Sequence, residues 1–296
     1  MVRIERLARL VVAAVVIGLS IAWIIWAING FTLSDSHAYR MAADRLLAGE
    51  DLYQAPLTQD EAFRYAPWFA AAWIPIAALP RAAGDALWAV TLLVATVVAI
   101  VPLARQPRLA GRLLAILAGT ILLWTAARGN VHPLVMAALI HGMNRRSGPL
   151  WVALAASLKA VPILFVLVYL ARREWWRAAS AVALTAVLVA PMPLLGWEPG
   201  TVGSGESLSL YYLVSPTVWA VAAVVALLLA IGATWRNSRH ASLAAAAAAI
   251  LALPRLLLYD LTYLLVAATP TAPARPESPS IDLGLPSLDA GAHGPE

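Results

Sequence analysis

Residues 10–31 read LVVAAVVIGLSIAWIIWAINGF, an apolar run without a charged side chain. A run of about 20 apolar residues spans the hydrocarbon core of a bilayer as a helix. Arg3, Arg6 and Arg9 precede the run, and basic residues beside a span stay on the cytoplasmic side. A secretory signal peptide has a shorter apolar core and a small-residue cleavage site. We therefore interpret residues 10–31 as a retained first membrane span with the N-terminus in the cytoplasm.

The composition extends this interpretation to the whole chain. Of its 296 residues, 61% are hydrophobic and 12% are charged, whereas a soluble domain is about 25% charged. The sequence therefore predicts an all-α integral membrane protein, a multi-pass helical bundle with about eight to ten membrane helices, including short or re-entrant ones. The chain has no cysteine, which excludes disulfides and thiolate metal sites. Its net charge of +5 reports orientation in the membrane rather than nucleic-acid binding.

Two of the later apolar runs leave alternatives open. Residues 68–79 are short and contain Pro75, which favours a re-entrant half-helix over a short crossing. Residues 150–170 carry Lys159 in an apolar run with basic residues at both ends. This run forms either a hairpin of two short helices with Lys159 near its tip, or a single span. The other expected membrane helices are residues 85–104, 113–127, 131–143, 178–195, 213–234, 241–254 and 256–269.

The longest polar interruption follows the first span. Residues 34–67 read SDSHAYRMAADRLLAGEDLYQAPLTQDEAFRYAP, and with the N-terminus inside, the loop at residues 32–67 is extracytoplasmic. Its first part predicts an amphipathic helix along the membrane surface that begins near Ser34 and ends at Gly49. The apolar face of this helix consists of Ala38, Met41, Ala42 and Leu46.

The remaining domain boundaries follow from the alternation of apolar spans and polar loops along the chain. Residues 196–212 are expected to form a second outer loop. Residues 1–269 form the membrane domain, and residues 270–296, rich in Pro and Ala, are expected to be disordered.

Asp35 is the first candidate for chemistry, because it stands directly after a span and above the hydrocarbon. A carboxylate there can accept the proton of a hydroxyl group brought in from outside. The alternative is a helix cap, which uses the same residue type.

Lys159 is the sharpest anomaly, because a lysine inside an apolar run costs several kcal/mol and marks a functional site by default. Arg64, beside Tyr65, and Arg128, in a turn with Gly129, are further cations that suit an anionic lipid head group. The alternatives are a snorkelling lysine, an interface anchor and a polar turn, respectively.

Neutral and acidic groups complete the candidate set. Asn130 and His132 offer the hydrogen bonds that sugar hydroxyls require, and Gly129 lets a ligand approach the backbone. Asp260 either belongs to the site or simply pairs with Arg255. The phosphate-loop, dinucleotide, zinc-protease and serine-hydrolase motifs of soluble enzymes are absent from the sequence.

Four segments carry a resemblance to a known family. They are DSHAY with LAGEDLY at residues 35–39 and 47–53, FRYAP at 63–67, GNVHPL at 129–134, and AASLKAVP at 155–162 with RREW at 172–175. In this order they resemble the motifs of glycosyltransferase family 87, multi-pass enzymes of the GT-C class that use a polyprenyl-phosphate sugar, commonly mannose. Asn130 and His132 stand where the family has Gln and Asn, and Tyr259-Asp260 is a weaker match.

The resemblance implies a GT-C-like membrane glycosyltransferase. It transfers a hexose, mannose in the first place, from a polyprenyl-phosphate donor to a glycolipid or cell-envelope glycan on the outer side of the plasma membrane. In this scheme Asp35 is the general base, and Lys159, Arg64 and Arg128 bind the donor phosphate. The residues expected to bind sugar or acceptor are His37, Tyr39, Tyr65, Asn130, His132 and Asp260.

Donor, acceptor and membrane lipids are the expected partners, and nucleic acid is not one. No metal or other cofactor is expected, because a lipid phosphate is already an activated leaving group. Two other functions remain open: a transporter or flippase for a lipid-linked substrate, and a catalytically silent subunit of envelope assembly. The lack of an internal repeat argues against the transporter.

Overall fold

The computed structural model describes residues 2–53, 62–197, 207–236 and 240–269. Over these ranges the chain is helical and contains no strand. The expected disordered tail at residues 270–296 and most of the second outer loop lie outside the described residues. The elements are α1 (Val2–Asn29), α2 (Ser34–Ala48), α3 (Pro67–Ala77), α4 (Arg81–Ala104), α5 (Leu109–Ala127), α6 (His132–Ala137), η2 (Ala138–Gly142), α7 (Gly148–Leu158), η3 (Val161–Phe165), α8 (Val166–Ala171), α9 (Trp175–Val189), η4 (Pro193–Leu195), α10 (Leu210–Leu213), α11 (Pro216–Trp235), α12 (Ala241–Leu251), η5 (Leu258–Tyr263) and α13 (Leu264–Ala268).

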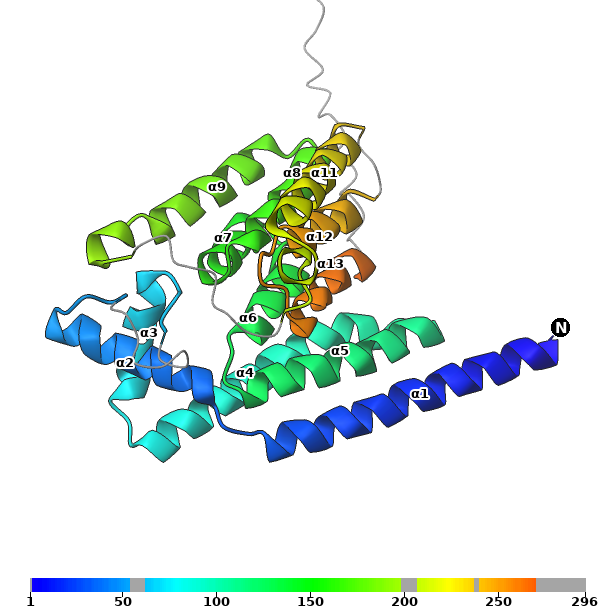
Figure 1. Cartoon of the computed structure of the whole chain (residues 1–296), viewed down its shortest axis with the longest axis horizontal. Coiled ribbons are helices and arrows are strands. Elements are labelled where there is room, and N and C mark those ends of the chain that lie inside the picture. The colour runs from blue at the N-terminus through cyan, green and yellow to red at the C-terminus, as the bar shows by residue number, and fades with distance from the viewer. Residues whose placement is uncertain (1, 54–61, 198–206, 237–239, 270–296) are drawn as a thin grey trace, which may run out of the picture.

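Four helical stretches of the described chain are long and apolar enough to cross a membrane: α4, α5, α9 with its extension to Leu195, and α11. Seven shorter apolar helical stretches accompany them, including Leu10–Trp26 within α1. The all-α, multi-pass fold predicted from the sequence is therefore confirmed. Figure 1 shows α1 running beside α5, while α2 and α3 lie together near the N-terminal end of α4.

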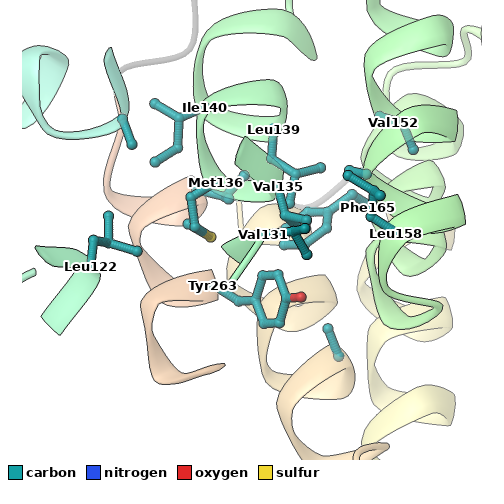
Figure 2. Close-up of a cluster of buried hydrophobic side chains, with 14 of the residues drawn as sticks. Leu122, Val131, Val135, Met136, Leu139, Ile140, Val152, Leu158, Phe165 and Tyr263 are labelled. Atoms are coloured by element: carbon teal, nitrogen blue, oxygen red, sulfur yellow. The ribbon is translucent and has the colours of Figure 1, made fainter. Parts of the chain in front are cut away.

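Two of the long helices have little protein around them. Of the most apolar 18-residue stretch of each helix, only 6% is buried within the protein in α11 and 11% in α9. A helix that is apolar on all sides and remains exposed in the protein is suited to lipid contact. The protein core lies elsewhere, between α5, α6, η2, α7 and η3, where Met136, Leu139 and Phe165 are fully buried (Figure 2).

Helix α2 forms where the sequence predicts it, and Gly49 caps its end with a positive φ of 69°. Its buried face, however, packs on protein. Tyr39 lies 5.0 Å from the ring of Phe69 and 5.3 Å from that of Trp73, both on α3. The prediction of a helix that lies with its apolar face on the membrane is corrected here, because α3 occupies the face that contains Ala38 and Ala42.

Helix α3 has 11 residues and ends four residues before α4 begins. At 1.5 Å per residue it is about 16 Å long, roughly half of what a crossing needs. It therefore does not span a bilayer by itself. Its entry into the membrane from the outer side stays a prediction.

The run at residues 150–170 is a hairpin, and the single-span alternative is wrong. Helix α7 stops at Leu158, the backbone of Lys159 is extended, and η3 starts again with Pro162 near its beginning. The two basic ends meet on one side, since Arg172 donates to Asn144 Oδ1 at 2.8 Å and Arg177 donates to the carbonyl oxygen of Arg145 at 2.6 Å. Lys159 is thus carried at the hairpin's tip, as one alternative of the sequence analysis predicted.

The start of α2 rests on the turn between α5 and α6. The backbone N–H of Asp35 donates to the carbonyl oxygen of Arg128 at 2.9 Å. Gly129 has a φ of +79°, and a Cβ there would lie 3.2 Å from Ser36 N and 3.3 Å from the backbone of Leu33. The glycine thus admits α2, rather than the ligand that the sequence analysis expected there.

We expect Gly129→Ala to destabilise the protein by about 1–2 kcal/mol, because a side chain disfavours the left-handed conformation and its Cβ would press on the start of α2. The thermal unfolding midpoint in detergent measures this change. Gly232→Ala is the matched control, since it lies in α11 with nothing within 4 Å of the added Cβ. Equal midpoints for the two variants would contradict the account.

Candidate functional site

A cavity of about 440 Å³ opens where α2, the α5–α6 turn, the tip of the α7–η3 hairpin and the segment before η5 meet. Seven of the ten predicted site residues line it: Asp35, Tyr39, Arg64, Tyr65, Arg128, Asn130 and Lys159. Other lining residues include Trp26, Trp124, Thr125, Arg255 and Tyr259. Segments that are far apart in the sequence therefore build one site.

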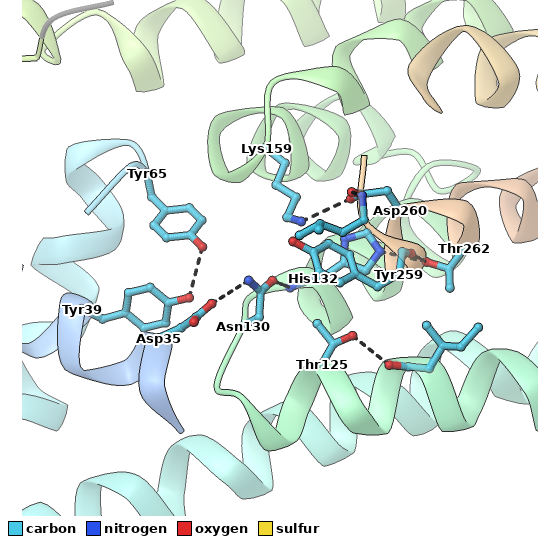
Figure 3. A network of polar contacts seen from close by, with 12 residues as sticks. Asp35, Tyr39, Tyr65, Thr125, Asn130, His132, Lys159, Tyr259, Asp260 and Thr262 are labelled. Atoms are coloured by element: carbon cyan, nitrogen blue, oxygen red, sulfur yellow. Dashed lines mark hydrogen bonds and ion pairs between the residues drawn. The ribbon is translucent and has the colours of Figure 1, made fainter. Parts of the chain in front are cut away.

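Asp35 lies in the first turn of α2, one position after the helix begins. Its Oδ2 accepts a hydrogen bond of 2.6 Å from Asn130 Nδ2, and Asn130 Oδ1 accepts one of 3.0 Å from the backbone N–H of His132 (Figure 3). The amide is fixed at both ends, so it orients the carboxylate. Asn130 is predicted from the sequence to bind a sugar hydroxyl. In the structure its side chain is instead bonded to the candidate base.

His132 lies behind the cavity wall and is fully buried. Its Nε2 lies 2.8 Å from Thr262 Oγ1, and the Thr262 hydroxyl donates to the carbonyl oxygen of Tyr259 at 2.6 Å. Because that hydroxyl proton is already used, Nε2 carries the proton and donates to Thr262. His132 therefore links Asn130 to the Tyr259 turn, and the structure does not bring it to the lining of the cavity, where the predicted contact with sugar would be made.

Lys159 points from the hairpin tip toward the same turn. Its Nζ lies 3.4 Å from Asp260 Oδ1 and 4.1 Å from the centre of the Tyr259 ring. The other oxygen of Asp260 accepts the backbone N–H of Leu257 at 3.0 Å. Asp260 therefore pairs with Lys159 and not with Arg255. Both its oxygens are bonded, and the structure does not bring it to the lining of the cavity, where the predicted contact with sugar would be made.

The charge of the cavity is predominantly positive. Arg64, Arg128, Arg255 and Lys159 line it, and Asp35 is the only acidic side chain among its lining residues. Arg64 and Arg128 are exposed at the opening. Such an arrangement favours an anionic ligand that approaches a single carboxylate.

Tyr39 and Tyr65 form the wall on the α2 side. Tyr39 donates to Tyr65 across 3.2 Å, and Tyr53 donates to the carbonyl oxygen of Tyr65 at 2.7 Å. Burial raises the pKa of the Tyr39 and Tyr65 phenols well above their usual value, and the Asp35 carboxylate adds to the effect. Both phenols therefore remain neutral and protonated at physiological pH.

His37 lies outside the cavity, so the structure does not bring it together with the other residues predicted to bind sugar. It is exposed and contacts Arg81 at the start of α4. Two residues along a helix turn a side chain by about 200°, whereas four turn it by about 40°. Asp35 and Tyr39 therefore share a face of α2, and His37 is on the opposite one.

Two features of the site are not among the predicted residues: the aromatic rings of Trp26, Trp124 and Tyr259 on its wall, and Arg255, which also lines the cavity. The rings of Trp26 and Trp124 stack at 5.1 Å with an angle of 13°, and Tyr259 follows at 6.5 Å from Trp124. Trp26 and Trp124 were visible only as aromatics near the ends of spans, a position that membrane interfaces also favour. In the described part of the chain, no group of three or more His, Asp or Glu residues could hold a metal ion.

We expect Asn130→Leu to lower kcat by about 10- to 100-fold in the reaction proposed below, because a displaced catalytic group costs that much. The change removes the amide that holds Asp35, while the KM for the donor should change little. Asn130→Gln, which keeps an amide, should recover part of the rate. An unchanged kcat in folded Asn130→Leu would remove Asn130 from the account.

Comparison with protein families gives one match. Residues 63–204 match the model of glycosyltransferase family 87. The matched range contains Arg64, Arg128, Asn130 and Lys159, whereas Asp35 precedes it. No curated protein and no solved structure matches the chain.

Proposed function

We propose that the chain transfers a hexose, mannose in the first place, from a polyprenyl-phosphate donor. The match of residues 63–204 to glycosyltransferase family 87, which indicates a glycosyltransferase, supports this proposal. The acceptor is a hydroxyl group of a glycolipid or cell-envelope glycan, and the reaction takes place on the outer side of the plasma membrane. The observation that carries the proposal is the single cavity that joins Asp35 with four cations.

The cations suit the donor. When the bond from the anomeric carbon to the phosphate oxygen breaks, negative charge grows on the phosphate, and fixed positive groups stabilise it. Arg64 and Arg128 at the opening and Lys159 at the hairpin tip are placed to do this. Asp260 and the Tyr259 ring hold Lys159 in position.

Asp35 suits the acceptor. Its carboxylate takes the proton of the attacking hydroxyl as the new carbon–oxygen bond forms, and the polyprenyl phosphate leaves. Inverting glycosidases use a carboxylate base in the same way. A single displacement of this kind inverts the configuration at the anomeric carbon, so donor and product should have opposite anomeric configurations.

A donor panel tests the proposal. Purified protein in lipid nanodiscs receives a crude glycolipid extract and either polyprenyl-phosphate mannose, polyprenyl-phosphate glucose or GDP-mannose. We expect labelled glycolipid and free polyprenyl phosphate from a lipid-linked donor only. Transfer from GDP-mannose instead would contradict the donor class. Movement of an intact lipid-linked sugar across a vesicle membrane, without transfer, would favour the transporter.

A further inference from the structure

We propose that Arg255 is the half-buried cation that binds the phosphate of the lipid-linked donor, and that Ser207 positions it. This inference rests on the proposed function and deepens it. Arg255 lies in the segment between α12 and η5 and lines the cavity. Its Nε is buried and has no hydrogen-bond partner among the described residues. An arginine that lines a cavity with a buried N–H unsatisfied is suited to receive an anion there.

The other cations of the cavity are less suited to this task. Lys159 is already paired with Asp260 at 3.4 Å and lies over Tyr259. Arg64 and Arg128 are exposed, so water screens their charge. Arg255 is half-buried, and its guanidinium can present two N–H groups to two phosphate oxygens at once.

The backbone next to Arg255 is fastened to the end of the second outer loop. Leu208 N–H donates to the carbonyl oxygen of Leu256 at 2.7 Å, and Leu256 N–H donates to Ser207 Oγ at 3.1 Å. Ser209 Oγ donates to the carbonyl oxygen of Leu253 at 3.0 Å. These bonds fix the residues on both sides of Arg255, so the long side chain starts from a defined backbone.

Binding of a short donor fragment tests the inference without requiring transfer. Farnesyl phosphate is titrated into the full-length protein in detergent, and tryptophan fluorescence reports binding, since Trp26 and Trp124 line the cavity. Farnesol and inorganic phosphate in parallel titrations separate the contribution of the lipid from that of the phosphate. We expect wild-type protein to bind farnesyl phosphate more tightly than either.

Arg255→Gln should weaken farnesyl phosphate binding on the order of tenfold or more, because a charged hydrogen bond is lost, and leave farnesol binding unchanged. Arg255→Lys should lie between the two, since it keeps the charge and loses the two-pronged contact. Arg108→Gln is the matched control, because Arg108 is exposed and does not line the cavity. Ser207→Ala should weaken binding in the same direction by a smaller factor.

The outcomes separate the two levels of the proposal. Tight binding by wild-type protein with equal binding by Arg255→Gln would overturn the role of Arg255 and leave the donor class standing. Wild-type protein that binds farnesyl phosphate no better than farnesol would overturn the donor class together with this inference. Ser207→Ala at wild-type affinity would overturn the positioning role of Ser207.

Discussion

Asp35→Asn is expected to abolish measurable transfer, with kcat reduced by about 10²- to 10⁴-fold, because the amide cannot accept the proton of the acceptor hydroxyl. The change keeps the size of the side chain. The amide oxygen can still accept the hydrogen bond from Asn130 Nδ2 that spans 2.6 Å in the wild type. The KM for the donor should change little, since the proposed phosphate contacts come from other segments.

The matched control is Asp44→Asn, on the same helix. Asp44 is exposed and does not line the cavity, so the Asp44→Asn enzyme should transfer sugar at the wild-type rate. Rates are measured as initial velocities of product formation in nanodiscs, and circular dichroism checks the helix content of each variant. A folded Asp35→Asn enzyme with near-normal kcat would show that Asp35 only shapes the start of α2.

Lys159→Met is the second large effect. We expect a loss of about 10²- to 10³-fold in kcat, because one preorganised positive group no longer faces the leaving phosphate. The change also leaves the carboxylate of Asp260, which is only 3% exposed, without its cation. Breaking a buried ion pair costs about 3–5 kcal/mol, so stability and catalysis must be separated.

The double variant Lys159→Met/Asp260→Asn makes that separation. It removes the unpaired charge, and the amide oxygen can still accept the N–H of Leu257. We expect the thermal midpoint to recover while transfer stays low. Recovery of transfer along with the midpoint would assign Lys159 a purely structural role.

Protection of Lys159 from reductive methylation gives a second test of its role. It is the only lysine in the sequence, so reductive methylation modifies this side chain and the N-terminal amine alone. Polyprenyl phosphate bound in the cavity should slow the methylation of Lys159 and leave that of the N-terminus unchanged. Mass spectrometry of the peptides measures both in one sample.

Much of the site could be predicted because its signals are local. The spacing of Asp35 and Tyr39 follows from helical periodicity, and a lysine beside a proline in an apolar run marks a break. The hairpin could be proposed from basic residues at both ends of that run. The first two of these inferences use residues within about one or two helical turns of one another, and the third uses the two ends of one apolar run.

The remaining features depend on contacts between distant segments. A pair with Arg255, its neighbour in sequence, is one of the two alternatives for Asp260, whereas its ion pair is with Lys159, 101 residues away. Likewise, Asn130 holds a carboxylate 95 residues before it. Which side chain meets which is decided by how α5, α7 and η5 pack, and periodicity carries no information on that.

His37 shows the opposite error. It was grouped with Asp35 because both lie in one short polar motif. The helix separates them onto different faces, so that His37 contacts Arg81 outside the cavity. A motif that is compact in sequence is therefore not compact in space once it becomes helical.

The most direct test of the central claim is release of polyprenyl phosphate from polyprenyl-phosphate mannose by purified protein with a crude glycolipid extract. Wild type, Asp35→Asn and Asp44→Asn are compared at equal folded concentration. The account predicts release and labelled glycolipid with wild type and Asp44→Asn, and neither with Asp35→Asn. Equal release by all three proteins would contradict the role of Asp35, and an intact donor with folded wild-type protein would contradict the proposed reaction.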